Sequence, residues 1–219
     1  MKLLAINGSP RKDWNTGTLL NKVLEGAASQ NAETELINLY DLQYRGCTSC
    51  FSCKKKDGAR ICAMKDDLTP LLEKLRTVDC IALGSPVYFM NITAGMAAFL
   101  ERFFFSNVIY SAEIPSIFPR KISSGFLYTM NMKKDQGEYM ELLKASLKPF
   151  EFFTEMVLGR KPEILYSYDT YQYSDYSKYE HSIFSEPDKA RQKKEQFHID
   201  CEQAFQMGVR LANKVAEAL

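Results

Sequence analysis

The sequence predicts an α/β domain built on a doubly wound parallel sheet. Short apolar runs of strand length recur along the chain, and segments with helical spacing of their apolar residues separate them. This alternation of strand and helix occurs five times, which is typical of a parallel sheet with helices on both faces. Polar turns follow three of the runs, at Asn7 to Pro10, Gly84 to Asn91 and Thr129 to Met132. With right-handed connections, we expect five parallel strands in the order 2-1-3-4-5.

The expected strands differ in how deeply they are buried. Leu3 to Ile6 and Val78 to Leu83 have the apolar composition of strands that are covered on both faces. Glu33 to Leu39 alternates polar and apolar residues, which indicates that one of its faces is less covered. Ile122 to Met130 and Glu163 to Tyr168 complete the expected sheet.

Capping residues and prolines fix the expected helix boundaries. The first helix begins near Asn15 or Thr16, either of which is a good N-cap. Leu68-Thr69-Pro70 is a cap followed by a proline at the first helical position, so a helix starts there. A later helix covers about 137–153, and Pro149 bends it or ends it.

Length and composition favour a single domain over residues 1–219. At 219 residues and 46% hydrophobic content, the chain can bury one sizeable core. Residues 40–67 form a cysteine-rich insertion after the second strand and have no periodic apolar pattern. Residues 166–219 comprise a tyrosine-rich, non-helical segment and a final helix from Ser185 onward. The tyrosines either cover a ligand, form an interface or pack on their own domain.

Charge and hydropathy exclude several partners. The formal net charge is +1 with 25% charged residues, which gives no argument for nucleic acid or an anionic membrane. No apolar run reaches membrane-spanning length, and the first run is too short for a signal peptide. We therefore expect a cytoplasmic protein without nucleic-acid or membrane partners. Its six cysteines would then be reduced, which favours metal, cluster or redox roles over disulfides.

The first strand-to-helix connection has the composition of a phosphate site. A helix N-terminus offers free N–H groups and the positive end of the helix dipole. Ser9, Thr16 and Thr18 add hydroxyl groups, and Arg11 adds a charge with bidentate reach. The chain has neither G-x-x-x-x-G-K-[ST] nor G-x-G-x-x-G, so a nucleoside triphosphate and a pyrophosphate both fit poorly. A single terminal monophosphate remains, with simple helix capping as the alternative.

Three groups of residues in the first half of the chain match a known family in order and spacing. They are Gly8-Ser9-Pro10-Arg11 with Asn15-Thr16 and Leu19; Gly84 to Phe89 with Gly95, Phe99 and Arg102; and a cysteine array that runs into Asp66-Asp67-Leu68. In this combination the chain resembles the NADPH-dependent FMN reductase branch of the flavodoxin-like superfamily, in particular its iron–sulfur flavoproteins. The C-terminal third carries no such motif.

The resemblance implies a flavodoxin-like fold with an FMN site on three loops. The residues that would hold the phosphate and ribityl chain are Ser9, Arg11, Asn15, Thr16, Gly17 and Thr18. Those that would line the isoalloxazine ring are Pro86, Val87, Tyr88, Phe89, Met90 and Asn91, with Thr129, Met130 and Asn131 on its other side. A flavin needs apolar walls and a few main-chain donors, and no side chain would be the catalyst.

The cysteine array follows a spacing that binds clusters or metals. Two residues separate each pair among Cys47, Cys50 and Cys53, and Cys62 follows after a longer gap. Two-residue gaps let thiolates converge on one [4Fe–4S] cluster. Four cysteines can also close a tetrahedral zinc site. The interpretation stays open between a cluster, zinc, and an ordered loop of free thiols that covers the flavin.

The resemblance implies an FMN-binding, NAD(P)H-dependent oxidoreductase that passes electrons to a small acceptor such as a quinone, azo or nitro compound. The rival hypothesis is an iron–sulfur flavoprotein that carries electrons or senses redox state between protein partners. A scaffold that has lost its cofactor is a third. We expect a homodimer or homotetramer, with Phe103 to Phe105, the tyrosines and the start of the last helix as candidate interface.

Overall fold

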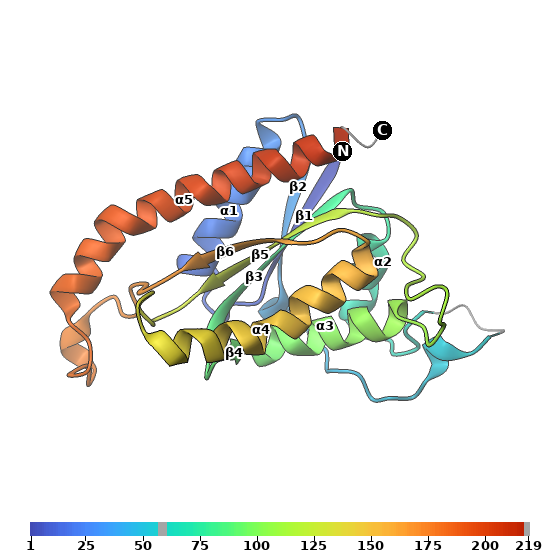
Figure 1. The fold of residues 1–219 in the computed structure, drawn as a ribbon, viewed down its shortest axis with the longest axis horizontal. Coiled ribbons are helices and arrows are strands. Elements are labelled where there is room, and N and C mark those ends of the chain that lie inside the picture. Colours follow the sequence, from blue (N-terminus) through green and yellow to red (C-terminus); the bar gives the residue numbers. More distant parts are fainter. Residues whose placement is uncertain (57–60, 217–219) are drawn as a thin grey trace.

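The computed structural model describes residues 1–56 and 61–216 and has alternating strands and helices (Figure 1). In chain order the strands and α-helices are β1 (Lys2–Asn7), α1 (Asn15–Ala28), β2 (Glu33–Asn38), α2 (Leu68–Leu75), β3 (Cys80–Tyr88), β4 (Asn91–Ile92), α3 (Ala94–Asn107), β5 (Ser123–Thr129), α4 (Gly137–Leu158), β6 (Glu163–Ser167) and α5 (Glu186–Ala216). Short 3-10 turns lie at Leu39–Asp41, Ser52–Lys54 and Tyr176–Lys178.

Five parallel strands form the sheet in the order β2-β1-β3-β5-β6. These are the five strands expected from the sequence, in the expected order, so the prediction of a flavodoxin-like doubly wound sheet is confirmed. The additional short strand β4 pairs antiparallel with the end of β3, where Val87 lies opposite Ile92.

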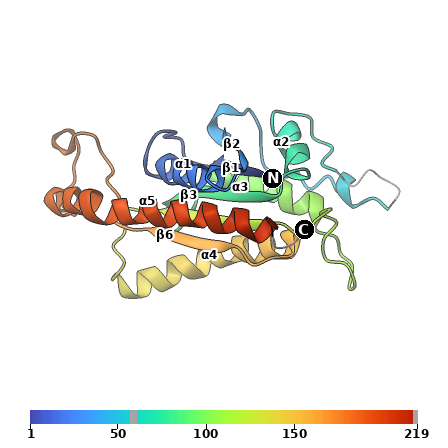
Figure 2. The ribbon, with the colours of Figure 1, turned by 90° about the horizontal axis from the view of Figure 1, so that it is seen from above.

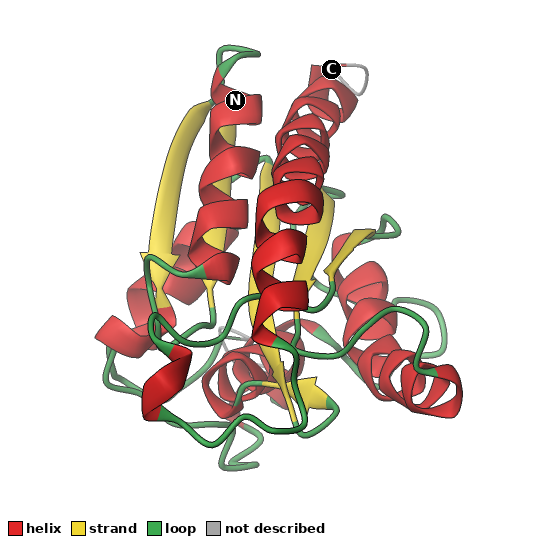
Figure 3. Cartoon of the chain, turned by 90° about the vertical axis from the view of Figure 1, so that its left-hand side faces the viewer, coloured by secondary structure: helices red, strands yellow, loops and turns green. Residues whose placement is uncertain are grey.

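The two faces of the sheet are covered by different helices. Successive side chains of a strand point to opposite faces, so Leu4 and Ile6 pack with α2, α3 and α4, whereas Leu3 and Ala5 pack with α1 and α5. Helices α1 and α5 lie side by side on the same face of the strands (Figure 3). The chain is therefore wound on both sides of one buried sheet, as the alternation predicted.

The third strand is longer than the sequence indicated. We expected it to end at Leu83 and a loop to begin at Gly84, but β3 continues to Tyr88 and turns back at once into β4. Phe89 and Met90 form the turn with positive φ angles of 49° and 63°. The extension occurs because β5 pairs with β3 as far as Pro86, so neighbouring strands supply hydrogen bonds that the local pattern does not reveal.

The first helix begins at Asn15, as expected, but its N-cap is Trp14, which caps without a side-chain hydrogen bond. Two other expected helix boundaries were wrong in detail. Helix α2 starts at Leu68, ahead of the proline that we expected at its first position. Helix α4 continues through Pro149 to Leu158, because its buried face runs on past the proline.

The cysteine-rich insertion and the amino-terminal part of α5 lie toward opposite ends of the molecule (Figure 1). The insertion follows α3 along its length: Tyr44 donates a hydrogen bond to the Gly95 carbonyl, and the Cys53 thiol donates one to the Phe105 carbonyl. The amino-terminal part of α5 extends beyond the strands, as Figure 2 also shows. Across the described ranges, we find no helix with the length and apolar character needed to cross a bilayer.

Candidate functional site

A cavity of about 440 Å³ opens at the carboxyl ends of β1, β3 and β5. Its size is within the range of about 300–1,000 Å³ typical of small-molecule sites. The predicted residues that line it are Ser9, Arg11, Asn15 and Thr16 from the first loop, Pro86, Val87, Tyr88 and Phe89 from the end of β3, and Thr129, Met130 and Asn131 after β5. The fold thus brings the three expected segments together around one hollow.

Four of the predicted residues do not line this cavity: Gly17, Thr18, Met90 and Asn91. Gly17 shapes the first loop instead, since a Cβ at this position would lie 1.7 Å from the Lys12 carbonyl oxygen. Asn91 accepts a hydrogen bond from the backbone N–H of Ile92, and the Met90 carbonyl accepts one from the Ser146 hydroxyl. These contacts stabilise the first loop and the β3–β4 hairpin without lining the cavity.

The first loop is held in shape by its own side chains. The Asn7 side-chain oxygen accepts a hydrogen bond from the Ser9 N–H at 3.0 Å, and the Ser9 hydroxyl accepts one from the Arg11 N–H at 3.1 Å. Within residues 1–56 and 61–216, no hydrogen bond is formed by the backbone N–H groups of Asn15 to Gly17. The amino terminus of α1 therefore presents free donors beside the cavity, as anion sites do.

Arg11, Trp14 and Asn15 hold a second segment over the first loop. Asn15 and the Trp14 indole N–H donate hydrogen bonds to the Tyr171 carbonyl at 2.9 and 3.0 Å. Arg11 donates to the Gln172 carbonyl at 2.5 Å and stacks on the Trp14 ring. We call residues 170–173 the cover segment, because Thr170, Gln172 and Tyr173 line the same cavity.

The sequence did not identify the cover segment or Trp14 as part of this site. The tyrosine-rich composition indicated a cover or an interface without saying what it would cover. The structure places the segment beside the first loop because Thr170 donates two hydrogen bonds to the Met130 carbonyl, one from its N–H and one from its hydroxyl. Arg11 and Asn15 consequently bind protein carbonyls in addition to facing the cavity.

The wall after β5 carries an unsatisfied polar atom. The Thr129 hydroxyl pairs with the Thr16 hydroxyl at 2.7 Å in a buried position. The Asn131 side-chain oxygen is buried, and it accepts no hydrogen bond from the described residues. A buried acceptor without a donor is unfavourable, so this oxygen fits a ligand that brings an N–H or O–H group.

The hairpin supplies the opposite, apolar wall. Phe89 has a fully exposed side chain and Tyr88 is 42% exposed, so two aromatic rings stand free beside the cavity. The hairpin base is tied to the first loop, because the Gly8 N–H donates to the Gly84 carbonyl and the Thr93 hydroxyl donates to the Gly8 carbonyl. Hydrogen bonds therefore join the hairpin that carries the aromatic wall to the loop that precedes the free N–H groups.

The four cysteines of the insertion share a different, small cavity of about 20 Å³ near the C-terminal end of α3. The Arg102 guanidinium donates a hydrogen bond to the Cys62 sulfur at 3.1 Å. Burial raises the pKa of the Cys53 thiol, whereas hydrogen bonds from Ser52 lower the pKa of the exposed Cys50 thiol.

The cysteines converge without forming a metal-ligand set. Among the residues that the structure describes, no group of three or more Cys, His, Asp or Glu is disposed to hold a metal ion. None of the four cysteines lines the larger cavity, and the described part of their loop does not border it. The cover segment has that position instead.

The fold is flavodoxin-like, and the larger cavity is a candidate small-molecule site at the carboxyl edge of the sheet. The family model of the NADPH-dependent FMN reductases matches residues 1–114. The chain therefore belongs to the NADPH-dependent FMN reductase family, which confirms the resemblance drawn from its motifs.

Curated relatives carry the name iron–sulfur flavoprotein. One from Archaeoglobus fulgidus is 41% identical over 102 residues, which cover 47% of this chain and 48% of that protein. One from Methanocaldococcus jannaschii is 37% identical over 102 residues, covering 47% of this chain and 51% of that protein. The matched region is thus about half the length of these relatives.

Solved structures support the fold. An NAD(P)H:quinone oxidoreductase from Methanothermobacter marburgensis superposes with a TM-score of 0.70 at 14% identity, covering 96% of this chain and 98% of that one. An FMN-dependent NADH-azoreductase from Bacillus anthracis, solved with FMN, gives a TM-score of 0.66 at 14% identity, covering 96% and 99%. At these identities the likeness establishes the fold alone.

Proposed function

We propose that this protein is an oxidoreductase that binds FMN in the 440 Å³ cavity and takes its electrons from NADPH or NADH. The observation that carries the proposal is the convergence of the first loop, the β3–β4 hairpin and the segment after β5 on one hollow. Family membership supports the same cofactor. A small acceptor such as a quinone, azo or nitro compound would receive the electrons.

The chemistry of the lining fits the parts of FMN. The free N–H groups at the start of α1, with Ser9, suit a terminal phosphate. Val87, Tyr88 and Phe89 offer an apolar wall for a flat ring, and the unpaired Asn131 oxygen offers it an acceptor. Bound FMN would supply the hydride and electron chemistry, while these residues orient it and the cover segment excludes water from one end.

Flavin binding and reduction test the proposal. The protein, purified without air, should bind added FMN stoichiometrically, and NADPH or NADH should bleach the visible flavin absorption band. Single turnovers with a quinone and an azo dye should then restore that band. A protein that fails to bind FMN, or a flavin-loaded protein that neither nucleotide reduces, would falsify the proposal.

An electron carrier with a bound iron–sulfur cluster is the second candidate. It is favoured by the gathering of Cys47, Cys50, Cys53 and Cys62 around one cavity and by the names of the relatives. The thiols are the right donors for such a cluster, although their present arrangement is not a ligand set. We therefore assign no electron transfer step to this cavity.

Metal analysis separates the outcomes for the cysteines. Anaerobically purified protein with about four iron and four sulfide per chain would support the cluster hypothesis. Stoichiometric zinc would support a structural site, and no metal would leave four free thiols. The Cys50→Ser variant should lose the metal in the first two cases, whereas the Cys201→Ser variant, outside this cavity, should keep it.

A homodimer or homotetramer remains our proposal for the assembly. The expected interface needs one correction, because Phe103 is 1% exposed and belongs to the core between α3 and the segment that contains Phe118. Sedimentation of the FMN-loaded protein would measure the assembly, and a single monomeric species would contradict it. A cytoplasmic location likewise stays a prediction.

A further inference from the structure

Asn131 lines the proposed FMN cavity, and its backbone is bound by the last helix. Its side-chain oxygen is buried and accepts no hydrogen bond from the described residues. The ammonium group of Lys189, in the first turn of α5, donates a hydrogen bond to the Asn131 carbonyl at 3.3 Å. A residue 58 positions further along the chain therefore contacts the cavity wall without lining the cavity itself.

The same ammonium group also binds the segment after β6. Lys189 pairs with Asp169 at 2.6 Å, and the two side chains are only 2% and 11% exposed. Asp169 directly precedes Thr170, which lines the cavity as part of the cover segment. The Asp169 N–H donates to the Met132 carbonyl at 2.7 Å. Lys189 thus links the segments after β5 and β6 at the place where both border the cavity.

The position of Lys189 is an unfavourable one for a lysine. Burial of an ammonium group is costly, and an ion pair compensates for that cost only in part. The first turn of a helix also disfavours a positive charge, because the helix dipole is positive at that end. Its partner Asp169 has a φ angle of 49°, in the left-handed region that few residues other than glycine adopt. An apolar side chain could fill the same space, but it could not bind the Asn131 carbonyl.

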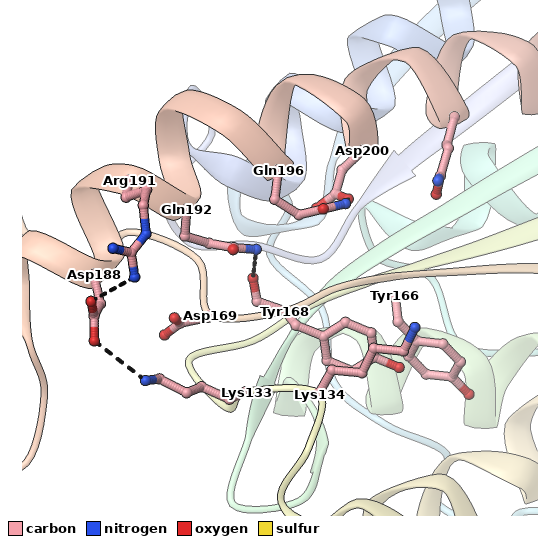
Figure 4. Close-up of a pocket in the computed structure, with 11 residues that line it drawn as sticks. Lys133, Lys134, Tyr166, Tyr168, Asp169, Asp188, Arg191, Gln192, Gln196 and Asp200 are labelled. Atoms are coloured by element: carbon pink, nitrogen blue, oxygen red, sulfur yellow. Dashed lines mark hydrogen bonds and ion pairs between the residues drawn. The ribbon is translucent and has the colours of Figure 1, made fainter.

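A second link between α5 and the segment after β5 lies at the surface. Asp188 pairs with Lys133 at 3.6 Å and with Arg191 at 2.8 Å, and Figure 4 shows the three side chains along the edge of α5. Their side chains are 38%, 51% and 65% exposed, and exposed ion pairs contribute little to holding a structure in place. Asp188 is therefore a matched comparison for its neighbour Lys189.

We propose that Lys189 is a positioning residue for flavin binding, which holds the Asn131 side-chain oxygen where it accepts a hydrogen bond from the N–H group of the flavin ring. The oxidised isoalloxazine ring has one N–H group, at N3, so the buried acceptor has one partner on the ring. Lys189 acts through the Asn131 carbonyl and through Asp169, and it does not touch the cofactor. The inference rests on the proposed function, since it concerns the cofactor of that reaction.

A flavin that lacks this N–H group tests the proposal. In 3-methyl-FMN a methyl group replaces the hydrogen at N3. We would measure the dissociation constants of 3-methyl-FMN and FMN by fluorescence quenching and take their ratio. The unmodified protein should give a ratio of about tenfold or more, because the methylated ring leaves the buried oxygen without a donor. Asn131→Ala removes the oxygen, so its ratio should be about fivefold lower.

Lys189→Met removes the ammonium group but leaves Asn131 in the chain. Its ratio should also fall about fivefold, chiefly through weaker binding of FMN, because the oxygen is no longer held toward the ring. A general loss of stability would weaken the binding of both flavins alike, so the ratio separates positioning from a merely structural role. In the double variant the ratio should equal that of Asn131→Ala, since Lys189 acts through Asn131.

Asp188→Asn is the control, because it removes a charge from the same helix turn and from an ion pair to the same segment. Its ratio should stay within about twofold of that of the unmodified protein. Lys189→Gln keeps a neutral N–H donor and covers the case in which Lys189→Met fails to fold. Its ratio should fall about twofold or more, because the ion pair with Asp169 is lost.

Three outcomes overturn the proposal. They are an unmodified protein that binds both flavins equally, a folded Lys189 variant whose ratio is unchanged, and a fall in Asp188→Asn as large as that in Lys189→Met. A double variant whose ratio is lower than that of Asn131→Ala would show that Lys189 acts by another route, and it also contradicts the proposal.

This inference and the proposed function can fail separately. If NADPH or NADH reduces the bound flavin but the ratio does not depend on Lys189, the proposed function stands and the role of Lys189 is wrong. If the ratio depends on Lys189 and Asn131 but neither nucleotide reduces the flavin, the positioning role stands and the proposed function is wrong. If the protein binds neither flavin, both are wrong.

Discussion

Individual side chains in the first loop have partners that are remote in sequence. Asn15 and Thr16 have the residue types of helix caps, and neither serves as one. Asn15 bonds to the carbonyl of Tyr171, and Thr16 pairs with Thr129, which are 156 and 113 residues away. Residue type correctly predicted that these polar groups would be used, but their partners depend on which strands become neighbours.

The hydrogen bond from the Trp14 indole to the cover segment allows a test of whether that segment helps to retain FMN. Trp14→Phe keeps an aromatic ring but removes the N–H that donates to the Tyr171 carbonyl. One such bond contributes about 1 kcal/mol, so we expect the dissociation constant of FMN to rise about fivefold. The quenching of FMN fluorescence on binding measures this dissociation constant.

Tyr179→Phe is the control for this variant, because Tyr179 belongs to the same tyrosine-rich region and does not line the cavity. It should leave the dissociation constant within about twofold of the unmodified protein. Equal FMN affinity in all three proteins would show that the cover segment does not retain the cofactor.

Among the elements, β3 and the cysteine-rich insertion depart most from expectation. The apolar run predicts a strand that ends at Leu83, but pairing with β5 extends it to Tyr88. The insertion lacks any periodicity, so its path could not be predicted. It is anchored by Arg102 of α3, whose buried guanidinium pairs with Asp66 at 2.7 and 3.1 Å.

The Asp66–Arg102 pair predicts how the insertion responds to acid. Hydrogen bonds from Arg102 lower the pKa of the Asp66 carboxyl. A lowered folded-state pKa stabilises the protein above the ordinary carboxyl value of about 3.9, and this contribution disappears as the pH falls through the lowered pKa. Acid should therefore destabilise the fold, and Asp66→Asn should reduce the dependence on pH in that window.

At neutral pH, Asp66→Asn leaves the buried Arg102 without its ion pair, and we expect it to lower the free energy of unfolding by about 3–5 kcal/mol. Urea unfolding at a series of pH values measures both effects. Asp135→Asn, an exposed carboxyl after β5, serves as control and should change stability by less than about 0.5 kcal/mol. Parallel pH curves for the unmodified protein and Asp66→Asn would contradict this account.

At the scale of the whole molecule, the two halves of α5 are held in place by different contacts. Its C-terminal half packs on α1, as the apolar stripe of Ala204, Met207 and Leu211 shows. Its polar first half is held by a buried ion pair, in which Lys189 and Asp169 have side chains only 2% and 11% exposed. The polar composition of this half of the helix predicts that Lys189 is solvent-exposed, whereas its side chain is buried at the edge of the sheet.

Lys189→Met should destabilise the protein by about 3–5 kcal/mol, since it leaves Asp169 buried without a counter-charge. Denaturant unfolding measures the loss, and hydrogen exchange should show that it concentrates in the first turns of α5 and in residues 167–173. Lys194→Met, on the exposed side of the same helix, should be close to neutral. If the two variants have the same stability, the ion pair does not hold α5 in place.

The sequence alone determined the alternation of strands and helices, the strand order, and the three segments that meet at the carboxyl edge of the sheet. These depend on local periodicity and on the handedness of connections, which are properties of short stretches of chain. Only the tertiary structure decided that the tyrosine-rich segment rather than the cysteine-rich one borders the first cavity. Such contacts join residues up to 161 positions apart, as between Arg11 and Gln172, and they exist only after the sheet has set the register of its neighbours.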